Sequence, residues 1–153
     1  MPGTPELLMV PAVGNWKYYW RVIDYLQKDA KKHGVLKGNS NFGSFWHNIG
    51  TVTHNPTRVY IAIGRQNRVM GYMIADNLRA QCDFDEPEVQ IIEVLPQFRR
   101  RGVGTAMMRW AMDLSSARKT KKMSLDPLPG NEAFFEKLGF VKNEKGKCVV
   151  VNG

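Results

Sequence analysis

The chain has 153 residues, of which 43% are hydrophobic and 24% are charged, and it carries a formal net charge of +8. These values are typical of an ordinary globular protein with one buried core, so we expect a single domain over 1–153. No apolar run approaches the length of a membrane span, and the N-terminus lacks a signal pattern. Both features argue against membrane insertion and favour a cytoplasmic protein.

Neither the cysteines nor the histidines are spaced as ligands of a metal ion. The cysteines, Cys82 and Cys148, are too few for a disulfide framework and fit a reducing compartment. The histidines are His33, His47 and His54. The sequence therefore predicts that no metal is bound.

The positive charge is concentrated in the second part of the chain. Residues 99–153 hold 12 Lys and Arg against 5 Asp and Glu, whereas residues 1–98 hold 10 against 9. Within 76–93, six acidic residues accompany a single base, Arg79. A basic half beside an acidic loop indicates two ligands of opposite charge, or else two solvated surfaces.

The first expected elements are a strand at Glu6–Val10 and a helix that begins after Asn15. Asn15 is a suitable N-cap, and Gly34 can end the helix. An apolar stripe follows the cap at helical spacing, and we assign it to core packing. The stripe consists of Trp16, Tyr19, Trp20, Ile23, Leu26 and Ala30. A second, weaker helical pattern covers Phe42–Ile49.

Three strands are predicted next, at Arg58–Gly64, Val69–Ala75 and Glu88–Leu95. The residues from Gly64 to Asn67 fit a hairpin between the first two, and a polar loop precedes the third. The third strand has apolar residues on both faces, as expected of a central strand. Pro96 cannot donate to a strand ladder, so the strand must end or splay there.

A basic, glycine-rich turn, Arg99–Thr105, follows at once and leads into a helical pattern. The first helical N–H groups are unsatisfied and lie at the positive end of the helix dipole, and arginine adds bidentate charged hydrogen bonds. A strand, such a turn and a helix in this order predict a site for phosphate groups. The helix has its apolar face at Val103, Ala106, Met107, Trp110, Ala111, Leu114 and Ala117.

The remaining elements are shorter. They are a strand at Met123–Leu125, a helix capped by Asn131 and ending at Gly139, and strands at Phe140–Val141 and Cys148–Val151. Helices and strands in this arrangement predict a mixed α/β fold around one sheet.

Two of these segments resemble the motifs of the GNAT acetyltransferase superfamily. Arg99-Arg100-Arg101-Gly102-Val103-Gly104 is similar to the family's Gln/Arg-x-x-Gly-x-Gly/Ala turn for acetyl-CoA. Asn131-Glu132-Ala133-Phe134-Phe135-Glu136-Lys137-Leu138-Gly139-Phe140 is similar to a later helix of the family, which commonly ends Phe-Tyr-Glu-Lys-Leu-Gly-Phe. The order of expected elements also fits: a strand, two helices, three strands, a helix, a strand, a helix and two strands.

The resemblance implies an α/β (α+β) fold with a mixed, mostly antiparallel central sheet that splays after its fourth strand. The pantetheine arm of acetyl-CoA would lie in the gap, and the diphosphate would lie on the basic turn. The cofactor-binding residues that it implies are Val94, Leu95, Pro96, Arg99, Arg100, Arg101, Gly102, Val103, Gly104, Thr105, Asn131, Phe134, Phe135 and Lys137.

Acetyl transfer to an amine needs a base, a donor to the carbonyl oxygen and a departing thiolate, because a lysine-like amine is protonated at neutral pH. Glu93, a carboxylate inside an apolar strand beside the expected thioester, is the first candidate base. Asp126, after the next strand, is the second. The backbone N–H of Val94 or Leu95 is the candidate donor. The structural alternatives are an ion pair for Glu93 and a capping or turn role for Asp126.

One position departs from the family pattern. The tyrosine that often protonates the departing thiolate is replaced by Phe135, which has no hydroxyl. A thiol is a fair leaving group, so the loss does not abolish catalysis in principle. Tyr60, Tyr72, Cys82, Ser124 or water are candidates to replace it. The departure also leaves open a non-catalytic, acyl-CoA-binding module.

The expected acceptor is a primary amine, either a small amine or polyamine, or a lysine or N-terminal amine. Acidic residues that could attract it are Asp83, Asp85, Glu86 and Glu88, and residues that could line its site are Phe45, Trp46 and His47, for which core packing is an equal alternative. Nucleic-acid binding is disfavoured because the basic residues are not interleaved with exposed aromatics. A homodimer is compatible with the sequence.

Overall fold

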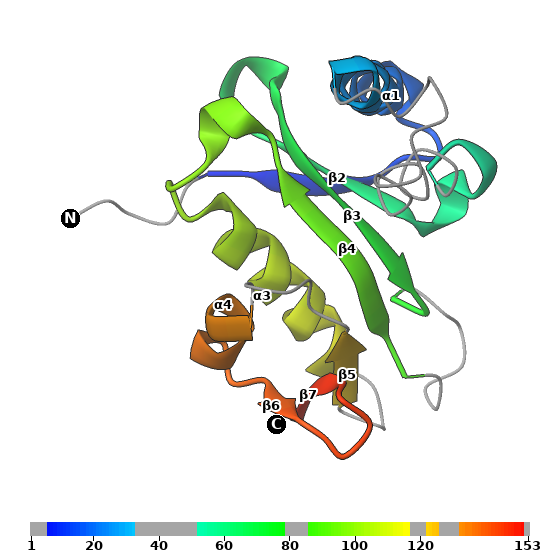
Figure 1. Ribbon diagram of the computed structural model, residues 1–153. Coiled ribbons are helices and arrows are strands. Elements are labelled where there is room, and N and C mark those ends of the chain that lie inside the picture. Colours follow the sequence, from blue (N-terminus) through cyan, green and yellow to red (C-terminus); the bar gives the residue numbers. More distant parts are fainter. Residues whose placement is uncertain (1–5, 33–51, 79–85, 117–121, 126–131, 152–153) are drawn as a thin grey trace.

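The computed structural model describes residues 6–32, 52–78, 86–116, 122–125 and 132–151 (Figure 1). The helices are α1 (Trp16–Lys32), α3 (Val103–Ser116) and α4 (Glu132–Lys137). The strands are β1 (Leu8–Pro11), β2 (Val59–Ile63), β3 (Val69–Asp76), β4 (Glu88–Val94), β5 (Lys122–Leu125), β6 (Val141–Lys142) and β7 (Cys148–Val151). The helix predicted at Phe42–Ile49 lies outside the described residues. None of the described helices is both long and apolar enough to cross a membrane.

The strands form one mixed sheet in the order β1-β2-β3-β4-β5-β7-β6. Neighbouring strands are antiparallel except β4 and β5, which are parallel. A short turn at Arg65–Asn67 joins β2 to β3, where the sequence predicts a hairpin. The predicted mixed, mostly antiparallel architecture is therefore confirmed.

The sheet opens between β4 and β5. These two strands pair only at Glu88 with Ser124 and at Val89 with Leu125. Beyond Val89, β4 continues along β3 as far as the pairing of Gly71 with Val94. Among the described residues, the second half of β4 thus pairs with β3 only, and the predicted splay after the fourth strand is confirmed.

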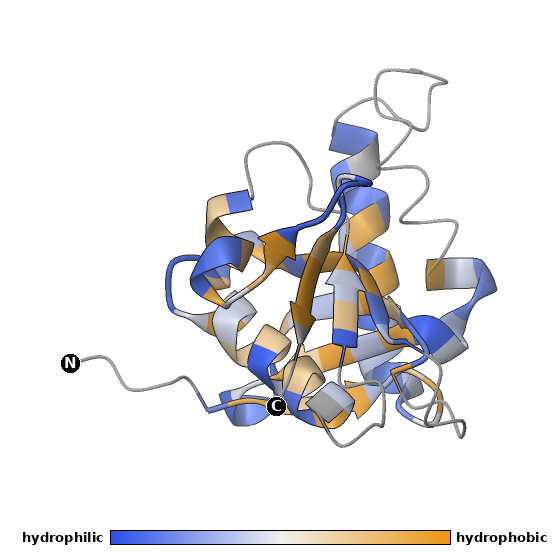
Figure 2. Cartoon of the chain, turned by 90° about the horizontal axis from the view of Figure 1, so that it is seen from below, coloured by the Kyte–Doolittle hydropathy of each residue, from blue (hydrophilic) through white to orange (hydrophobic). Residues whose placement is uncertain are grey.

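Helices cover both faces of the sheet. α1 lies on one face, where the Tyr25 hydroxyl reaches Glu93 of β4, and α3 lies on the other, where Trp110 packs on Tyr60 of β2 (Figure 1). All five residues of β2 are buried because both of its faces are covered. Figure 2 shows the same layering, with hydrophobic central strands and hydrophilic turns at the periphery.

The buried face of α1 differs from the predicted stripe. Tyr19, Val22 and Leu26 are at most 5% exposed, whereas Trp16 and Trp20 are 46% and 63% exposed. The prediction that both tryptophans pack in the core was therefore wrong. Both rings instead rest on the edge of the core, with centroids 5.4 Å from that of Tyr19.

The same helix interleaves exposed aromatic rings with cations. Lys17 and Arg21 are exposed and alternate with Trp16 and Trp20 along the first turns. These residues are distinct from Arg99–Arg101 and Lys119–Lys122, on which the prediction against nucleic-acid binding rests.

Candidate active site

The basic turn after β4 leads directly into the N-terminus of α3. A short 3-10 turn at Pro96–Phe98 is followed by Arg100 and Gly102, whose φ angles are 64° and 79°. The Gly102 carbonyl accepts the first helical hydrogen bond, from the Ala106 N–H at 3.0 Å. The N–H groups of residues 103–105 lie in the first helical turn and have no intrahelical acceptor. They form a site with which an anion can bond.

A cleft of ≈ 540 Å³ opens in front of these N–H groups. Ligand sites commonly measure about 300–1,000 Å³. Its lining comes from β4, the turn, α3 and α4, and consists of Ile92, Val94, Phe98, Arg99, Arg100, Gly102, Val103, Gly104, Thr105, Phe134 and Phe135. Nine residues of the predicted cofactor set therefore line one cleft.

Glycine at position 104 keeps this cleft open. A Cβ atom placed there would lie 3.4 Å from Cζ of Phe134 and 3.6 Å from Cγ2 of Val94. A side chain would therefore occupy the narrow space between β4 and α4. Any larger residue would compete with a ligand for that volume.

Sequence reasoning missed Ile92 and Phe98 as lining residues. Ile92 is two residues from Val94 and so shares its face of β4, a period-two signal that was available. Four predicted residues are not among the lining set: Leu95, Pro96, Arg101 and Lys137. Asn131 and Asp126 lie outside the described residues.

The backbone of Val94 faces the gap in the sheet. The Leu95 N–H donates to the Met70 carbonyl of β3 at 2.8 Å. Because successive residues of an antiparallel strand direct their backbone groups to opposite sides, the N–H and carbonyl of Val94 point away from β3. Of the two predicted donors, Leu95 is therefore already engaged, and Val94 directs its N–H into the gap.

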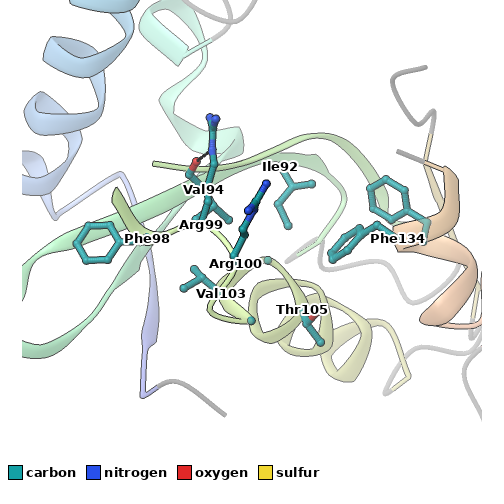
Figure 3. A pocket seen from close by; sticks show the side chains of 11 residues that line it. Ile92, Val94, Phe98, Arg99, Arg100, Val103, Thr105 and Phe134 are labelled. Atoms are coloured by element: carbon teal, nitrogen blue, oxygen red, sulfur yellow. Dashed lines mark hydrogen bonds between the residues drawn. The ribbon is translucent and has the colours of Figure 1, made fainter. Parts of the chain in front are cut away.

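Two adjacent arginines of the turn point in different directions. Figure 3 shows Arg99 turned back along β4, with its Nε donating to the Val94 carbonyl oxygen at 2.9 Å. Arg100 extends into the cleft, toward the side of Ile92 (Figure 3). Its positive φ redirects the chain there.

Glu93 lies on the opposite face of β4 from the cleft lining and is held by hydroxyl donors. Its side chain is 18% exposed. The Tyr72 hydroxyl donates to Oε1 at 2.7 Å, and the Tyr25 hydroxyl donates to Oε2 at 2.8 Å. Nη2 of Arg99 lies 3.5 Å from Oε2. The carboxylate is therefore fixed in position close to the open edge of β4.

Tyr25 is the partner of Glu93 that sequence reasoning missed. Burial, followed by the hydrogen bond and the charge of Glu93, raises the pKa of the Tyr25 phenol above its ordinary value of 10.0. The phenol therefore stays protonated and remains a donor across the neutral range. Tyr25 lies outside the apolar stripe predicted for α1. An aromatic residue with a hydroxyl at the border between the apolar and polar faces of a helix was the sequence signal that could have indicated a hydrogen-bonding role.

Phe135 is enclosed by other rings. It is 5% exposed, and its centroid lies 4.9 Å from that of Phe134 and 6.0 Å from that of Phe140. Of the side chains considered as substitutes for the missing hydroxyl, Tyr72 bonds Glu93 and Tyr60 packs on Trp110, and neither lines the cleft. Ser124 is buried in β5, and Cys82 lies outside the described residues.

Most residues predicted for the acceptor site also lie outside the described residues, namely Asp83, Asp85, Phe45, Trp46 and His47. Glu86 and Glu88 are described, and neither lines the cleft. Glu86 is exposed, and Glu88 pairs with Nζ of Lys147 at 3.0 Å. Within the described ranges, no cluster of three or more His, Cys, Asp and Glu side chains could hold a metal ion.

Most of the chain matches a known protein family. The sequence profile of the family described as "Acetyltransferase (GNAT) family" matches residues 22–140. The match includes β2 to β4, the basic turn, α3 and α4. No curated protein matches the sequence significantly.

Several solved structures share the fold over nearly the whole chain. GCN5 from Tetrahymena is 13% identical with a TM-score of 0.67, covering 97% of this chain and 96% of its own. A GNAT family acetyltransferase from Listeria monocytogenes is 16% identical with a TM-score of 0.62, covering 97% and 95%. A chain of the NatC complex bound to Gag peptide and CoA is 15% identical with a TM-score of 0.62, covering 97% and 99%. At these identities the likeness concerns the fold alone.

Proposed function

The chain belongs to the GNAT family of acetyltransferases, and from that premise we propose that it transfers the acetyl group of acetyl-CoA to a primary amine by direct attack in a ternary complex. The proposal rests on one observation, which is that the gap in the sheet and an anion-binding helix N-terminus lie beside each other. The gap beyond Val89 of β4 and the open N-terminus of α3 adjoin the same cleft.

The cofactor would lie along this cleft with its phosphates at the turn. The N–H groups of residues 103–105 and the guanidinium of Arg100 supply the donors and the charge that a diphosphate needs. The pantetheine arm, which carries amide groups, would add to the unpaired edge of β4 as a strand does. The aromatic rings of Phe134 and Phe135 close the opposite wall.

The Val94 N–H would be the donor to the thioester carbonyl. It points into the gap, whereas the Leu95 N–H is bonded to Met70. Attack by the amine forms the new C–N bond and places negative charge on the carbonyl oxygen. A fixed N–H aimed at that oxygen stabilises the charge as it develops.

Glu93 would take the proton that the amine must lose, directly or through water. Its carboxylate is held by Tyr25 and Tyr72, so its orientation costs no reorganisation during the reaction. Collapse of the tetrahedral intermediate breaks the C–S bond and releases CoA thiolate. Because Phe135 stands in place of tyrosine, we propose water as the donor of the proton that the thiolate takes up.

The acceptor is proposed only as a class. The partly exposed carboxylate of Glu93 suits a cationic amine, such as a small amine, a polyamine, a lysine side chain or a peptide N-terminus. The NatC relative is described as bound to a peptide, so peptides belong in any acceptor panel beside small amines.

The test is an amine panel followed by release of free thiol from acetyl-CoA. The panel contains a polyamine, free lysine, an aminoglycoside and peptides with free N-termini, and calorimetry measures CoA affinity in parallel. The proposal expects CoA binding and thiol release that depends on at least one amine. CoA binding without release for any amine would leave an acyl-CoA-binding module, and absence of CoA binding would contradict the proposal altogether.

A further inference from the structure

The side chain of Arg99, the first residue of the basic turn, points back toward β4 and not into the cleft. Its Nε donates to the Val94 carbonyl oxygen at 2.9 Å, and its Nη2 lies 3.5 Å from Oε2 of Glu93. Figure 3 shows it reaching back to β4 while Arg100 extends into the cleft. Consecutive residues of one basic motif therefore serve two sides of the site.

We propose that Arg99 is a positioning residue for the acyl-transfer end of the site and not a ligand of the cofactor phosphates. This inference rests on the proposed function, because it requires the thioester to lie in the gap beside Val94. Within the described turn, Arg100 and the α3 N–H groups then bind phosphate. Arg99 instead holds the backbone at the edge of β4 in position.

The first reason concerns the Val94 carbonyl. Both backbone groups of Val94 face the gap, so a thioester bonded to the N–H would lie near the carbonyl oxygen as well. That oxygen repels negative charge. Arg99 donates a charged hydrogen bond to this oxygen, which offsets the repulsion and holds the Val94–Leu95 peptide unit beside the donor N–H in place.

The second reason concerns timing. A positive charge beside the Val94 N–H interacts little with a neutral thioester and more strongly with the oxyanion that forms during attack. A residue that acts in this way changes turnover more than cofactor affinity. The contact with Glu93 adds less, because it is long and the Arg99 side chain is 53% exposed.

The binding test compares Arg99→Gln with Arg100→Gln, since each variant removes one positive charge from the same turn. Lys145→Gln, in the exposed turn before β7, controls for net charge. Calorimetry measures CoA affinity of each intact protein. We expect Arg99→Gln to stay within about fivefold of the parent, the size of a screened surface interaction. Arg100→Gln should lose about tenfold or more, as for a charge-assisted hydrogen bond.

The turnover test uses the amine selected by the panel at saturating acetyl-CoA. Arg99→Gln should lower kcat by about 10²-fold, the usual cost of an oxyanion-site group, with the KM for acetyl-CoA within about fivefold. Arg99→Lys should recover part of the loss because its cation can still reach the Val94 carbonyl. Thermal unfolding of each variant separates these effects from misfolding.

Two results would overturn the inference. One is a loss of CoA affinity in Arg99→Gln as large as that in Arg100→Gln. The other is an unchanged kcat in Arg99→Gln. The binding arm needs no acceptor, so it decides the assignment even if no amine is accepted. Failure of the parent protein to bind CoA contradicts the proposed function instead and is thereby distinguished.

Discussion

Among single residues, Glu93 is the one whose surroundings say most about chemistry. It accepts hydrogen bonds from two tyrosines that come from different elements, Tyr25 of α1 and Tyr72 of β3. A structural carboxylate in such a strand would be expected to pair with a buried cation. Among the described residues, its ion-pair partner is the exposed guanidinium of Arg99, and its own side chain is 18% exposed.

Replacing this carboxylate by its amide tests its role as a base. Glu93→Gln keeps the size and polarity of the side chain but cannot take a proton at neutral pH. We expect kcat to fall by about 10²–10⁴-fold, the usual contribution of general-base catalysis, with CoA affinity retained. Steady-state thiol release and calorimetry measure the two quantities. Glu144→Gln, in an exposed turn, is the matched control, and an unchanged kcat in Glu93→Gln would remove Glu93 as the base.

The raised pKa of Tyr25 predicts how stability depends on alkaline pH. The folded state holds the phenol proton more tightly than the unfolded state, whose phenol titrates near 10.0. The stabilisation is therefore complete below about pH 10 and is lost as pH rises from there toward the folded-state pKa. Urea unfolding between pH 9 and pH 11 measures this decline.

The Tyr25→Phe variant should reduce that alkaline loss of stability. Part of the loss should remain, because burial also raises the pKa of Tyr19. Tyr18→Phe, about two turns earlier in α1, is the control for removing a phenol from the same helix. Equal slopes of stability against pH in the parent and in Tyr25→Phe would contradict the assignment of the proton to Tyr25.

Among elements, the junction of the turn with α3 lines the cleft proposed to bind the cofactor. Gly104 lies in the first turn of α3 between Val94 and Phe134. Helix formation there does not need glycine, because φ is not positive at this position. The glycine is therefore explained by the space it leaves in the cleft and not by backbone conformation.

Adding a methyl group at position 104 distinguishes the two explanations of this glycine, open space in the cleft and backbone conformation. Gly104→Ala should raise the stability of the protein by up to about 1 kcal/mol, since alanine favours helix more than glycine does. The methyl group would project into the cleft, so CoA affinity should fall by about tenfold or more. Thermal unfolding and calorimetry on the same sample measure both. A variant that is stabilised and binds CoA as the parent does would show that the ligand does not pass this point.

At the scale of the whole molecule, the family assignment says more about the ligand than the surface composition does. The exposed tryptophans of α1 lie beside cations, so composition alone would not exclude nucleic-acid binding. The open sheet and the profile match over 22–140 favour a CoA ligand instead.

A ligand that bridges β4, the turn and α4 should stabilise the whole fold. At a CoA concentration of about 100 times Kd, linkage predicts about 2.7 kcal/mol of stabilisation, or roughly 5–11 °C in Tm for a chain of this size. The shift should shrink as salt is raised, because the phosphate contacts are partly exposed. Adenosine without phosphates is the matched control. An equal shift with adenosine would indicate that the phosphate cradle is not used.

The sequence by itself determined most of the described elements and the position of the basic turn that lines the cleft. Apolar periodicity placed α1, α3 and the three central strands within two residues of their observed ends, and Pro96 marked the end of β4. Such signals are local: each depends on residues a few positions apart. The motif at Arg99–Gly104 is local too, because a helix N-terminus carries its own free N–H groups wherever the helix lies.

Only the tertiary structure decided which side chains meet. Tyr25 and Tyr72 reach Glu93 across 68 and 21 residues of sequence, and no local pattern encodes that convergence. The choice between Val94 and Leu95 as donor depends on strand register, which pairing with β3 sets. The exposure of Trp16 and Trp20 depends on how α1 rotates against the sheet. The direction of Arg99 depends on the Val94 carbonyl, which the strand register leaves facing away from β3.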